Sequence, residues 1–313
     1  MRIVFFGTPS LAVPTLAALS ESHTIAAVIT QPDRPRGRSS KPEPSEVKQW
    51  AVAHGLTVDQ PQRIHDGSFE ASLKALEPDL CVVAAYGRLL RQAVLDVPPL
   101  GWLNMHPSLL PRWRGPSPIQ SALLYGDVVT GVTIMRMVLE MDAGNIVLQE
   151  ETPIGAEETA GELTDRLAVL GADAMVRAVD LIASGTAPDI VQDVSRVTTT
   201  TLFEKKYGNM VWAASASALH NQVRACNPWP MAQCRFRGQL CRILRTRLIS
   251  DSEEKDAAPG TVLEVHKDHV VLATGKGKLA LLQLQMAGKK PLDAADFLRG
   301  AHLTVGERFE DVH

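Results

Sequence analysis

Cysteine is scarce in this chain of 313 residues, and no apolar run is long. The four cysteines, Cys81, Cys226, Cys234 and Cys241, form no Cys-x-x-Cys pair, which argues against a metal cluster. This cysteine usage fits a reducing cytoplasm. The apolar runs stay short of the roughly 20 residues that a membrane-spanning helix needs.

Targeting and dinucleotide-binding signals are also missing. Residues 1–7 hold too short an apolar run for a signal peptide and lack a cleavage region, and no Arg-rich, acid-poor leader follows. Gly7-Thr8-Pro9 is not a Gly-x-Gly-x-x-Gly turn, which disfavours dinucleotide binding. We therefore expect a cytoplasmic protein that has no membrane segment and binds no metal.

The charge of the chain is distributed unevenly along its length. The net charge is −3, yet residues 205–313 carry 16 Lys and Arg against 11 Asp and Glu, whereas residues 1–204 carry 16 against 24. A basic C-terminal part suits a polyanionic partner such as nucleic acid, although a solvated basic surface would give the same counts.

Residues 1–150 alternate short apolar runs with amphipathic ones. This alternation predicts an α/β domain with a doubly wound, Rossmann-like parallel sheet. Strands are expected at Ile3–Phe6, Thr24–Thr30, Leu80–Ala85 and Trp102–His106, and a helix at 45–54 with Ser45 as its cap.

The second half of the chain predicts a different architecture. Thr159 and Glu162 form a capping-box pattern before a helix that ends near Ala183. A linker is expected at 190–208, between an N-terminal domain at 1–189 and a C-terminal domain at 209–313. Five short strands predict a small β-barrel of the OB-fold type there: Ala232–Phe236, Leu240–Ile249, Gly260–Val265, His269–Thr274 and Lys278–Gln285.

The predicted strand that ends at His106 carries an amide and an imidazole two residues apart. On an extended backbone, Asn104 and His106 share a face and lie about 7 Å apart along the strand. An amide donor can stabilise the oxyanion of an acyl transfer, and a His can move protons near neutral pH. Such a pair also serves as a cap or a satisfied core pair, so both interpretations remain open.

A carboxylate that could orient the His is offered by Asp142. It lies in Met141-Asp142-Ala143-Gly144, between two apolar runs, which is a loop or strand-end position where α/β proteins place chemistry. A carboxylate there would stabilise the charged form of His106. An Asp before Ala-Gly is also a common turn residue.

Eight segments in order along the chain strengthen the chemical interpretation: Phe5–Pro9, Thr30–Arg38, Val83–Gly87, Asn104–Gly115, Gly131–Met135, Met141–Gly144, Asn227–Pro230 and Ala287–Lys290. Together they resemble the folate-dependent formyltransferases, and most closely those that act on methionyl initiator tRNA. The resemblance spans nearly the whole chain and implies the same two-domain architecture.

The resemblance also implies roles for particular residues. Asn104, His106 and Asp142 correspond to the family's catalytic set. Ser108, Leu109, Leu110 and Pro111 correspond to its folate-binding turn, and Tyr86 and Gly87 to a loop that flanks the pterin. The implied reaction moves a formyl group from 10-formyltetrahydrofolate to the amino group of methionyl initiator tRNA, for translation initiation. One departure is Pro107, where many relatives carry Gly.

Residues 31–44, QPDRPRGRSSKPEP, form a long loop rich in cations and proline. The resemblance implies that this loop reaches the acceptor end of the tRNA, with Arg38 at a family position. Arg36 and Lys41 are further candidates, although a solvated loop would look the same. Arg112-Trp113-Arg114 could contact nucleic acid or clamp the folate turn.

Further tRNA contacts are expected at Lys206, Lys289 and Lys290. Lys205–Asn209 lacks the charge pattern that the family shows before its linker helix. We expect a monomer, since no pattern in the sequence suggests an obligate dimer. Three rival functions remain: a formyltransferase for a small amine, a hydrolase that releases formate from the same folate, and a non-enzymatic RNA-binding protein.

Overall fold

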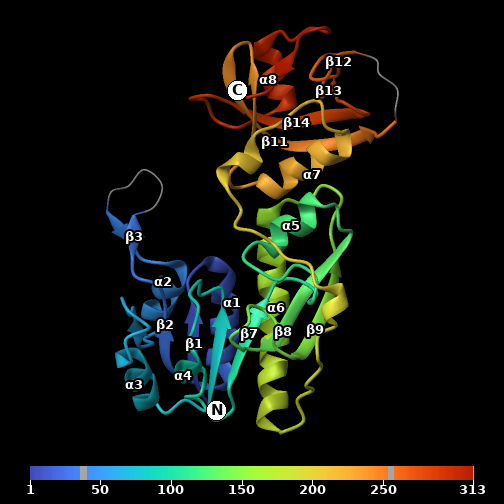
Figure 1. Ribbon diagram of the computed structural model, residues 1–313. Helices are drawn as coiled ribbons and strands as arrows, with labels where there is room; N and C mark the ends of the chain where they lie inside the picture. The colour runs from blue at the N-terminus through green and yellow to red at the C-terminus, as the bar shows by residue number, and fades with distance from the viewer. Residues whose placement is uncertain (36–40, 253–256, 313) are drawn as a thin grey trace. The chain divides into compact units, whose positions relative to one another are not determined.

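The computed structural model describes residues 1–35, 41–252 and 257–312 (Figure 1). The chain divides into two compact units. The first comprises Met1–Gly115, Val129–Pro153 and Thr164–Thr200, and the second comprises Pro116–Val128, Ile154–Leu163 and Thr201–His313. Both units are therefore assembled from segments that are not contiguous in sequence.

The first unit is built on a mixed sheet with strand order β5-β2-β1-β6-β7-β8-β9. The pairs from β5 to β7 are parallel, and β8 and β9 extend the sheet with antiparallel pairing. The strands are β1 (Arg2–Gly7), β2 (Thr24–Ile29), β5 (Val58–Asp59), β6 (Leu80–Ala84), β7 (Trp102–His106), β8 (Val129–Arg136) and β9 (Ile146–Pro153). A separate ribbon pairs β3 (Arg34–Pro35) with β4 (Pro42–Glu43).

The sheet predicted from the sequence is confirmed, with the antiparallel β8 and β9 as the difference. For the pairing of β8 with β9, the reason is the length of the connection. A parallel crossover needs a dozen or more residues, and the loop from Met137 to Asn145 is too short for one. The two apolar runs on either side of Asp142 therefore pair as neighbours, and Asp142 is placed in the loop between them.

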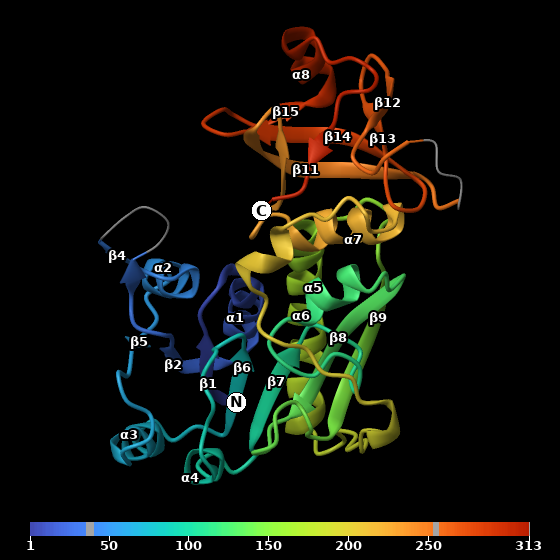
Figure 2. The same ribbon diagram turned by 45° about the horizontal axis from the view of Figure 1, so that its top comes forward.

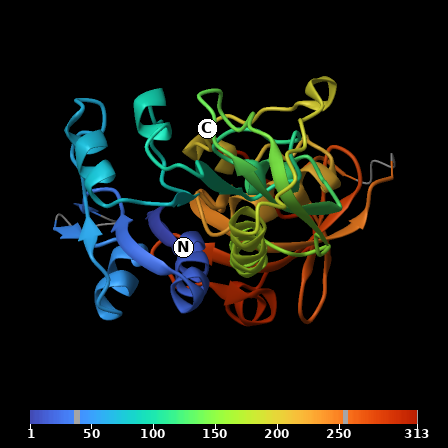
Figure 3. The same ribbon diagram turned by 90° about the horizontal axis from the view of Figure 1, so that it is seen from below.

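Helices cover both faces of this sheet, with α1 and α6 on one face and α3 and α4 on the other (Figures 1 and 3). The predicted caps are confirmed: Ser45 Oγ accepts from the Lys48 amide, and Thr159 and Glu162 bond reciprocally. The helices are α1 (Val13–Ser22), α2 (Glu46–Ala53), α3 (Ser68–Ala75), α4 (Gln92–Leu95) and α6 (Ala160–Ala183), with short 3₁₀ turns at Ser10–Ala12 and Val194–Arg196.

Aromatic side chains fill the core between β1, β6 and β7. The Phe6 ring lies 5.3 Å from that of Tyr86 and 4.8 Å from that of Trp102, centroid to centroid. The Trp102 indole donates to the Leu95 carbonyl at 3.1 Å, which satisfies its buried N–H. This core fixes β7, the strand that carries Asn104 and His106.

The second unit is built on an antiparallel sheet of order β12-β13-β14-β11-β10-β16, with β15 paired to β14. An antiparallel bridge between Thr261 and Arg308 links its two edges, so the sheet curls toward a barrel. The five predicted strands are confirmed. The bounds are β10 (Ala232–Phe236), β11 (Gln239–Ser250), β12 (Val262–Val265), β13 (Val270–Ala273), β14 (Lys278–Met286), β15 (Leu292–Asp293) and β16 (Phe309–Glu310).

Helices pack on this curled sheet, α7 against β11 and α8 against β14 (Figure 2). The helices of the unit are α5 (Pro118–Leu124), α7 (Ala216–Cys226) and α8 (Ala294–Ala301), with a 3₁₀ turn at Lys205–Gly208. None of the helices in the described part of the chain combines the length and the apolar character that crossing a membrane requires.

Candidate active site

Asn104 and His106 occupy β7, and their side chains leave the strand on the same face. Asn104 pairs with Val83 of β6 and Met135 of β8, so it lies inside the sheet. Its side chain is half-buried, and its amide has no hydrogen-bond partner among the described residues. The amide is therefore available to donate to a bound group.

His106 is buried and held in one tautomer. Its Nε2 lies 2.9 Å from the Trp113 carbonyl oxygen, which can only accept, so Nε2 carries the proton and donates. In the neutral ring, Nδ1 is then the unprotonated nitrogen. Burial lowers the pKa of His106 below its usual value of 6.5, against the opposing effects of the Asp142 charge and the Trp113 carbonyl. The end of β7 therefore presents an unprotonated Nδ1 that can accept a proton.

Asp142 faces that basic nitrogen from the loop between β8 and β9. Its Oδ2 lies 3.7 Å from His106 Nδ1 and accepts from the Gly115 amide at 2.7 Å. The φ of Asp142 is 54°, in the left-handed region that Asp tolerates better than most residues. Gly144 closes the loop, since a Cβ there would lie 1.7 Å from the Arg136 carbonyl oxygen.

The turn Ser108–Pro111 is fastened by two polar side chains that the sequence did not single out. Thr133 Oγ1 donates to the Ser108 carbonyl at 2.7 Å and accepts from the Leu110 amide at 3.1 Å. Gln149 Nε2 donates to the Leu110 carbonyl at 3.0 Å and to Thr133 Oγ1 at 2.8 Å. The turn is thereby fixed on β8 and β9, directly after His106.

Pro107 fits the turn that it occupies. The Ser108 amide donates to the His106 carbonyl at 2.9 Å, which makes a three-residue γ-turn centred on Pro107. The inverse γ-turn has φ near −75°, close to the φ that the proline ring imposes. The missing N–H of proline takes no part in that bond, so this hydrogen bond is compatible with the departure from the family pattern.

The Tyr86–Gly87 turn follows β6 and lies at the same end of the sheet as His106, because β6 and β7 are parallel neighbours. The Tyr86 ring is buried in the core. Gln31 donates to the Tyr86 carbonyl at 2.8 Å. A ligand at this turn would therefore meet backbone rather than the Tyr86 ring.

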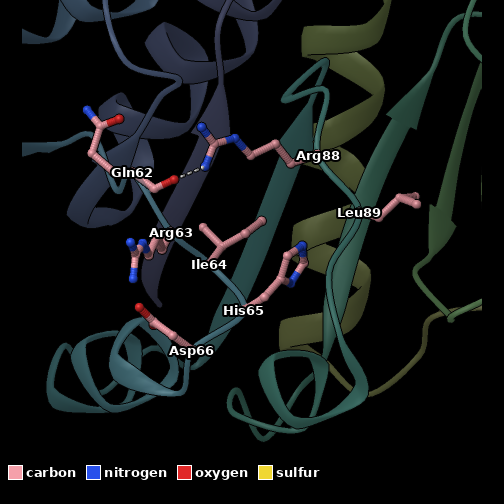
Figure 4. A pocket seen from close by; sticks show the side chains of 7 residues that line it. All are labelled: Gln62, Arg63, Ile64, His65, Asp66, Arg88 and Leu89. Atoms are coloured by element: carbon pink, nitrogen blue, oxygen red, sulfur yellow. Dashed lines mark hydrogen bonds between the residues drawn. The ribbon is translucent and has the colours of Figure 1, made fainter.

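A cavity of about 560 Å³ opens beside the residues that follow this turn (Figure 4). Arg88 is tied to its wall, donating to the carbonyls of Pro61 and Gln62 at 3.0 and 3.3 Å. Arg88 and Arg63 together outweigh the one carboxylate of the lining, Asp66, which suits an anionic group. The lining residues are Gln62, Arg63, Ile64, His65, Asp66, Arg88 and Leu89.

Arg114 is a buried structural cation. Its guanidinium donates to Gln192 Oε1 through Nε at 3.1 Å and Nη2 at 2.9 Å, and it lies 3.2 Å from a Glu140 carboxylate oxygen. The Arg114 guanidinium is therefore engaged within the protein, with partners in the loop between β8 and β9 and in the stretch after α6 rather than in the turn Ser108–Pro111. Gln192 is buried at 4% exposure, and no pattern in its Thr- and Val-rich stretch of sequence indicates a site residue there.

The cations predicted to contact tRNA belong to both units. Arg36 and Arg38 lie outside the described residues, and Lys41 is exposed near β4. Lys206 is exposed, and its salt bridge with Glu204 at 3.0 Å raises the lysine pKa. Lys289 and Lys290 are exposed in the loop between β14 and β15. Within the described ranges, no three His, Cys, Asp or Glu side chains are grouped to hold a metal ion.

Known proteins resemble this chain over both units. A Formyl transferase family model matches residues 1–179, and a model for the Formyl transferase C-terminal domain matches residues 203–302. The methionyl-tRNA formyltransferase of Solibacter usitatus is 44% identical over the whole of both chains, and that of Stutzerimonas stutzeri is 46% identical over 95% of this chain and 93% of its own.

The fold is shared with a solved sugar formyl transferase. The sugar 3N-formyl transferase WlaRD, solved in the presence of dTDP and 5-N-formyl-THF, superposes with a TM-score of 0.67 at 17% identity, covering 93% of this chain and 99% of its own. From the match of both domain models and of near full-length relatives, we conclude that this chain belongs to the formyl transferase family and is a transferase.

Proposed function

We propose that this chain transfers the formyl group of 10-formyltetrahydrofolate to the α-amino group of methionyl initiator tRNA. The observation that carries the proposal is the pairing, on one face of β7, of an unengaged Asn104 amide with a neutral His106. The full-length relatives that are named methionyl-tRNA formyltransferase support the choice of acceptor.

The chemistry follows from the positions of these atoms. The amine nitrogen attacks the formyl carbon, and the Asn104 amide donates to the oxyanion of the tetrahedral intermediate. His106 Nδ1 accepts the proton that the amine loses, which makes the ring an imidazolium beside the Asp142 carboxylate. The bond from carbon to folate N10 then breaks, N10 takes the proton that His106 had accepted, and tetrahydrofolate leaves while His106 returns to its neutral form.

The same geometry suggests how folate is held. The turn Ser108–Pro111 would contact the folate, with Leu109 and Leu110 supplying apolar surface and Thr133 fixing the backbone. The Tyr86–Gly87 turn would offer backbone groups to the pterin. The cationic cavity that follows it would take the carboxylates of the folate's glutamate tail.

We assign the binding of the RNA part of the acceptor to lysine and arginine side chains. Lys41, Arg36 and Arg38 would reach phosphates from the first unit, and Lys206, Lys289 and Lys290 from the second. We further propose that the protein works in the cytoplasm as a monomer. Its four cysteines are buried free thiols, which supports a reducing compartment.

An acceptor comparison tests this function against its rivals. The full chain is incubated with 10-formyltetrahydrofolate and methionyl initiator tRNA, glycinamide ribonucleotide, a nucleotide-linked amino sugar, or no acceptor. The expected result is formylmethionyl-tRNA with the first acceptor only. Product with a small amine alone would favour the first rival, and formate released without an acceptor would favour a hydrolase. Binding of tRNA without any product would favour a plain RNA-binding protein.

A further inference from the structure

The extended stretch between α6 and the second unit contacts the candidate active site at two places. The first contact is Gln192, whose Nε2 donates to the carbonyls of Asp142 and Gly144, each at 2.8 Å. Its Oε1 accepts twice from the Arg114 guanidinium. Both polar atoms of this buried side chain are therefore used, and they join the Asp142 loop to the segment that follows the folate turn.

The second contact lies a few residues later. Thr198 Oγ1 accepts from the Trp113 amide at 2.9 Å, and the Thr198 carbonyl accepts from the Arg114 amide at 2.9 Å. The Thr200 amide donates to the Arg114 carbonyl at 2.7 Å, and a Cβ at Gly115 would lie 2.8 Å from Thr200. Residues 198–200 thus line the backbone of Trp113, Arg114 and Gly115.

Those backbone groups are the ones that hold His106 and Asp142. The Trp113 carbonyl accepts a hydrogen bond from His106 Nε2, and the Gly115 amide donates to Asp142 Oδ2. Residues 192–200, which we call the strap, therefore fasten both partners of His106. We propose that the strap is a positioning element of the active site, which sets the distance and orientation of Asp142 and Trp113 relative to His106.

Two features argue for positioning beyond simple packing. Asp142 has a positive φ, a conformation that costs even an Asp some free energy relative to the ordinary helical or extended regions, and Gln192 bonds the carbonyl of that residue. The exposed residues on the strap, Asp193 to Arg196, form a local turn of their own. The anchoring is thus concentrated in Gln192 and in residues 198–200.

The physical consequence is a change in the basicity of His106. Asp142 is the charged group that faces its ring, and the Trp113 carbonyl bonds its Nε2 proton. Arg114 and Glu140, the other charges of this network, pair with each other. Both partners favour the imidazolium, so loosening them lowers the His106 pKa further and weakens it as a base.

Matched variants separate positioning from stability. Gln192→Glu keeps the shape and the acceptor for Arg114 but removes both donors to the Asp142 loop. Thr198→Val removes the acceptor for the Trp113 amide, and Thr198→Ser retains it. Gln239→Glu, at an exposed position in β11, is the control for the added charge. Each variant is assayed for kcat and KM, for thermal unfolding, and for the His106 pKa by NMR.

We expect Gln192→Glu and Thr198→Val to lower kcat by about 10- to 100-fold with little change in KM for tRNA. Thr198→Val, which adds no charge near the ring, should also shift the His106 pKa downward. Thr198→Ser should restore both properties, and Gln239→Glu should match the wild type. An unchanged His106 pKa in Thr198→Val, or a kcat loss that only follows the unfolded fraction, would overturn the proposal. The kinetic reading rests on the proposed function, but the NMR measurement needs no substrate. A wild type without formyl transfer would thus refute the function separately.

Discussion

His106 Nδ1 lies 3.7 Å from Asp142 Oδ2, too far for a hydrogen bond and close enough for charge attraction. With Nε2 donating to Trp113, this distance leaves Nδ1 free in the neutral ring. Once Nδ1 is protonated, the Asp142 carboxylate lies beside the new positive charge and stabilises it. The pair therefore combines a neutral resting base with stabilisation of its product.

The first prediction concerns acid stability. Because burial holds the His106 pKa below 6.5 in the folded protein, the unfolded chain binds the proton more tightly. This contribution to the free energy of unfolding is complete above pH 6.5 and is lost as the pH falls from there through the folded pKa. Urea unfolding of the wild type and of His106→Asn, from about pH 8 to pH 5, measures it. The stability of the wild type should fall more steeply, whereas equal slopes would contradict the account.

The second prediction concerns the unengaged amide. Asn104→Leu keeps a side chain of similar size and removes the donor, so the oxyanion loses its hydrogen bond. We expect kcat to fall by about 100- to 1000-fold, with KM for folate and for tRNA nearly unchanged. Asn104→Asp, which has a similar shape but no donor when ionised, should lose activity to a comparable degree. Full activity in both variants would remove Asn104 from the mechanism.

The parts of the fold that follow local rules could be predicted from the sequence. Ser45, Thr159 and Glu162 act within one helical turn, and each forms the cap that its residue type favours. The five strands of the second unit follow from alternation and turns. By contrast, α5 (Pro118–Leu124) is a short helix with little periodic signal, and it was not anticipated.

The site was predictable only in part, because a sequence pattern reports on residues that are close along the chain and not on contacts between distant segments. Asn104 and His106 share a strand, so their common face follows from spacing alone. The contacts of Thr133, Gln149 and Gln192 join segments that are distant in sequence, and no local pattern marks them. The roles assigned to Asn104, His106 and Asp142 stay predictions until variants are measured.

The third prediction concerns the turn Ser108–Pro111, which we propose binds folate. Thr133→Val removes the hydroxyl that joins Ser108, Leu110 and Gln149, and it leaves buried groups without partners. We expect a loss of about 1–3 kcal/mol in the free energy of unfolding and a several-fold rise in KM for 10-formyltetrahydrofolate. KM for tRNA should stay near that of the wild type. Steady-state kinetics with each substrate varied in turn decide the question. A rise confined to tRNA would be inconsistent with this role.

The fourth prediction concerns the loop between β14 and β15. If Lys289 and Lys290 bind tRNA phosphates, replacing either with Ala should weaken tRNA binding similarly across sequences. Each replacement should lower the slope of log affinity against log salt by about 1. Lys74→Ala, an exposed lysine on α3, is the charge-matched control and should leave the slope unchanged. The same slope in all variants would exclude these two lysines as phosphate contacts.

The most direct test of the account is formyl transfer by His106→Ala, measured in a single turnover together with tRNA affinity. Without Nδ1 the attacking amine has no base, so we predict that transfer from 10-formyltetrahydrofolate is nearly abolished while methionyl-tRNA binds as tightly as before. Transfer at the wild-type rate would contradict the central claim that His106 moves the proton in this reaction.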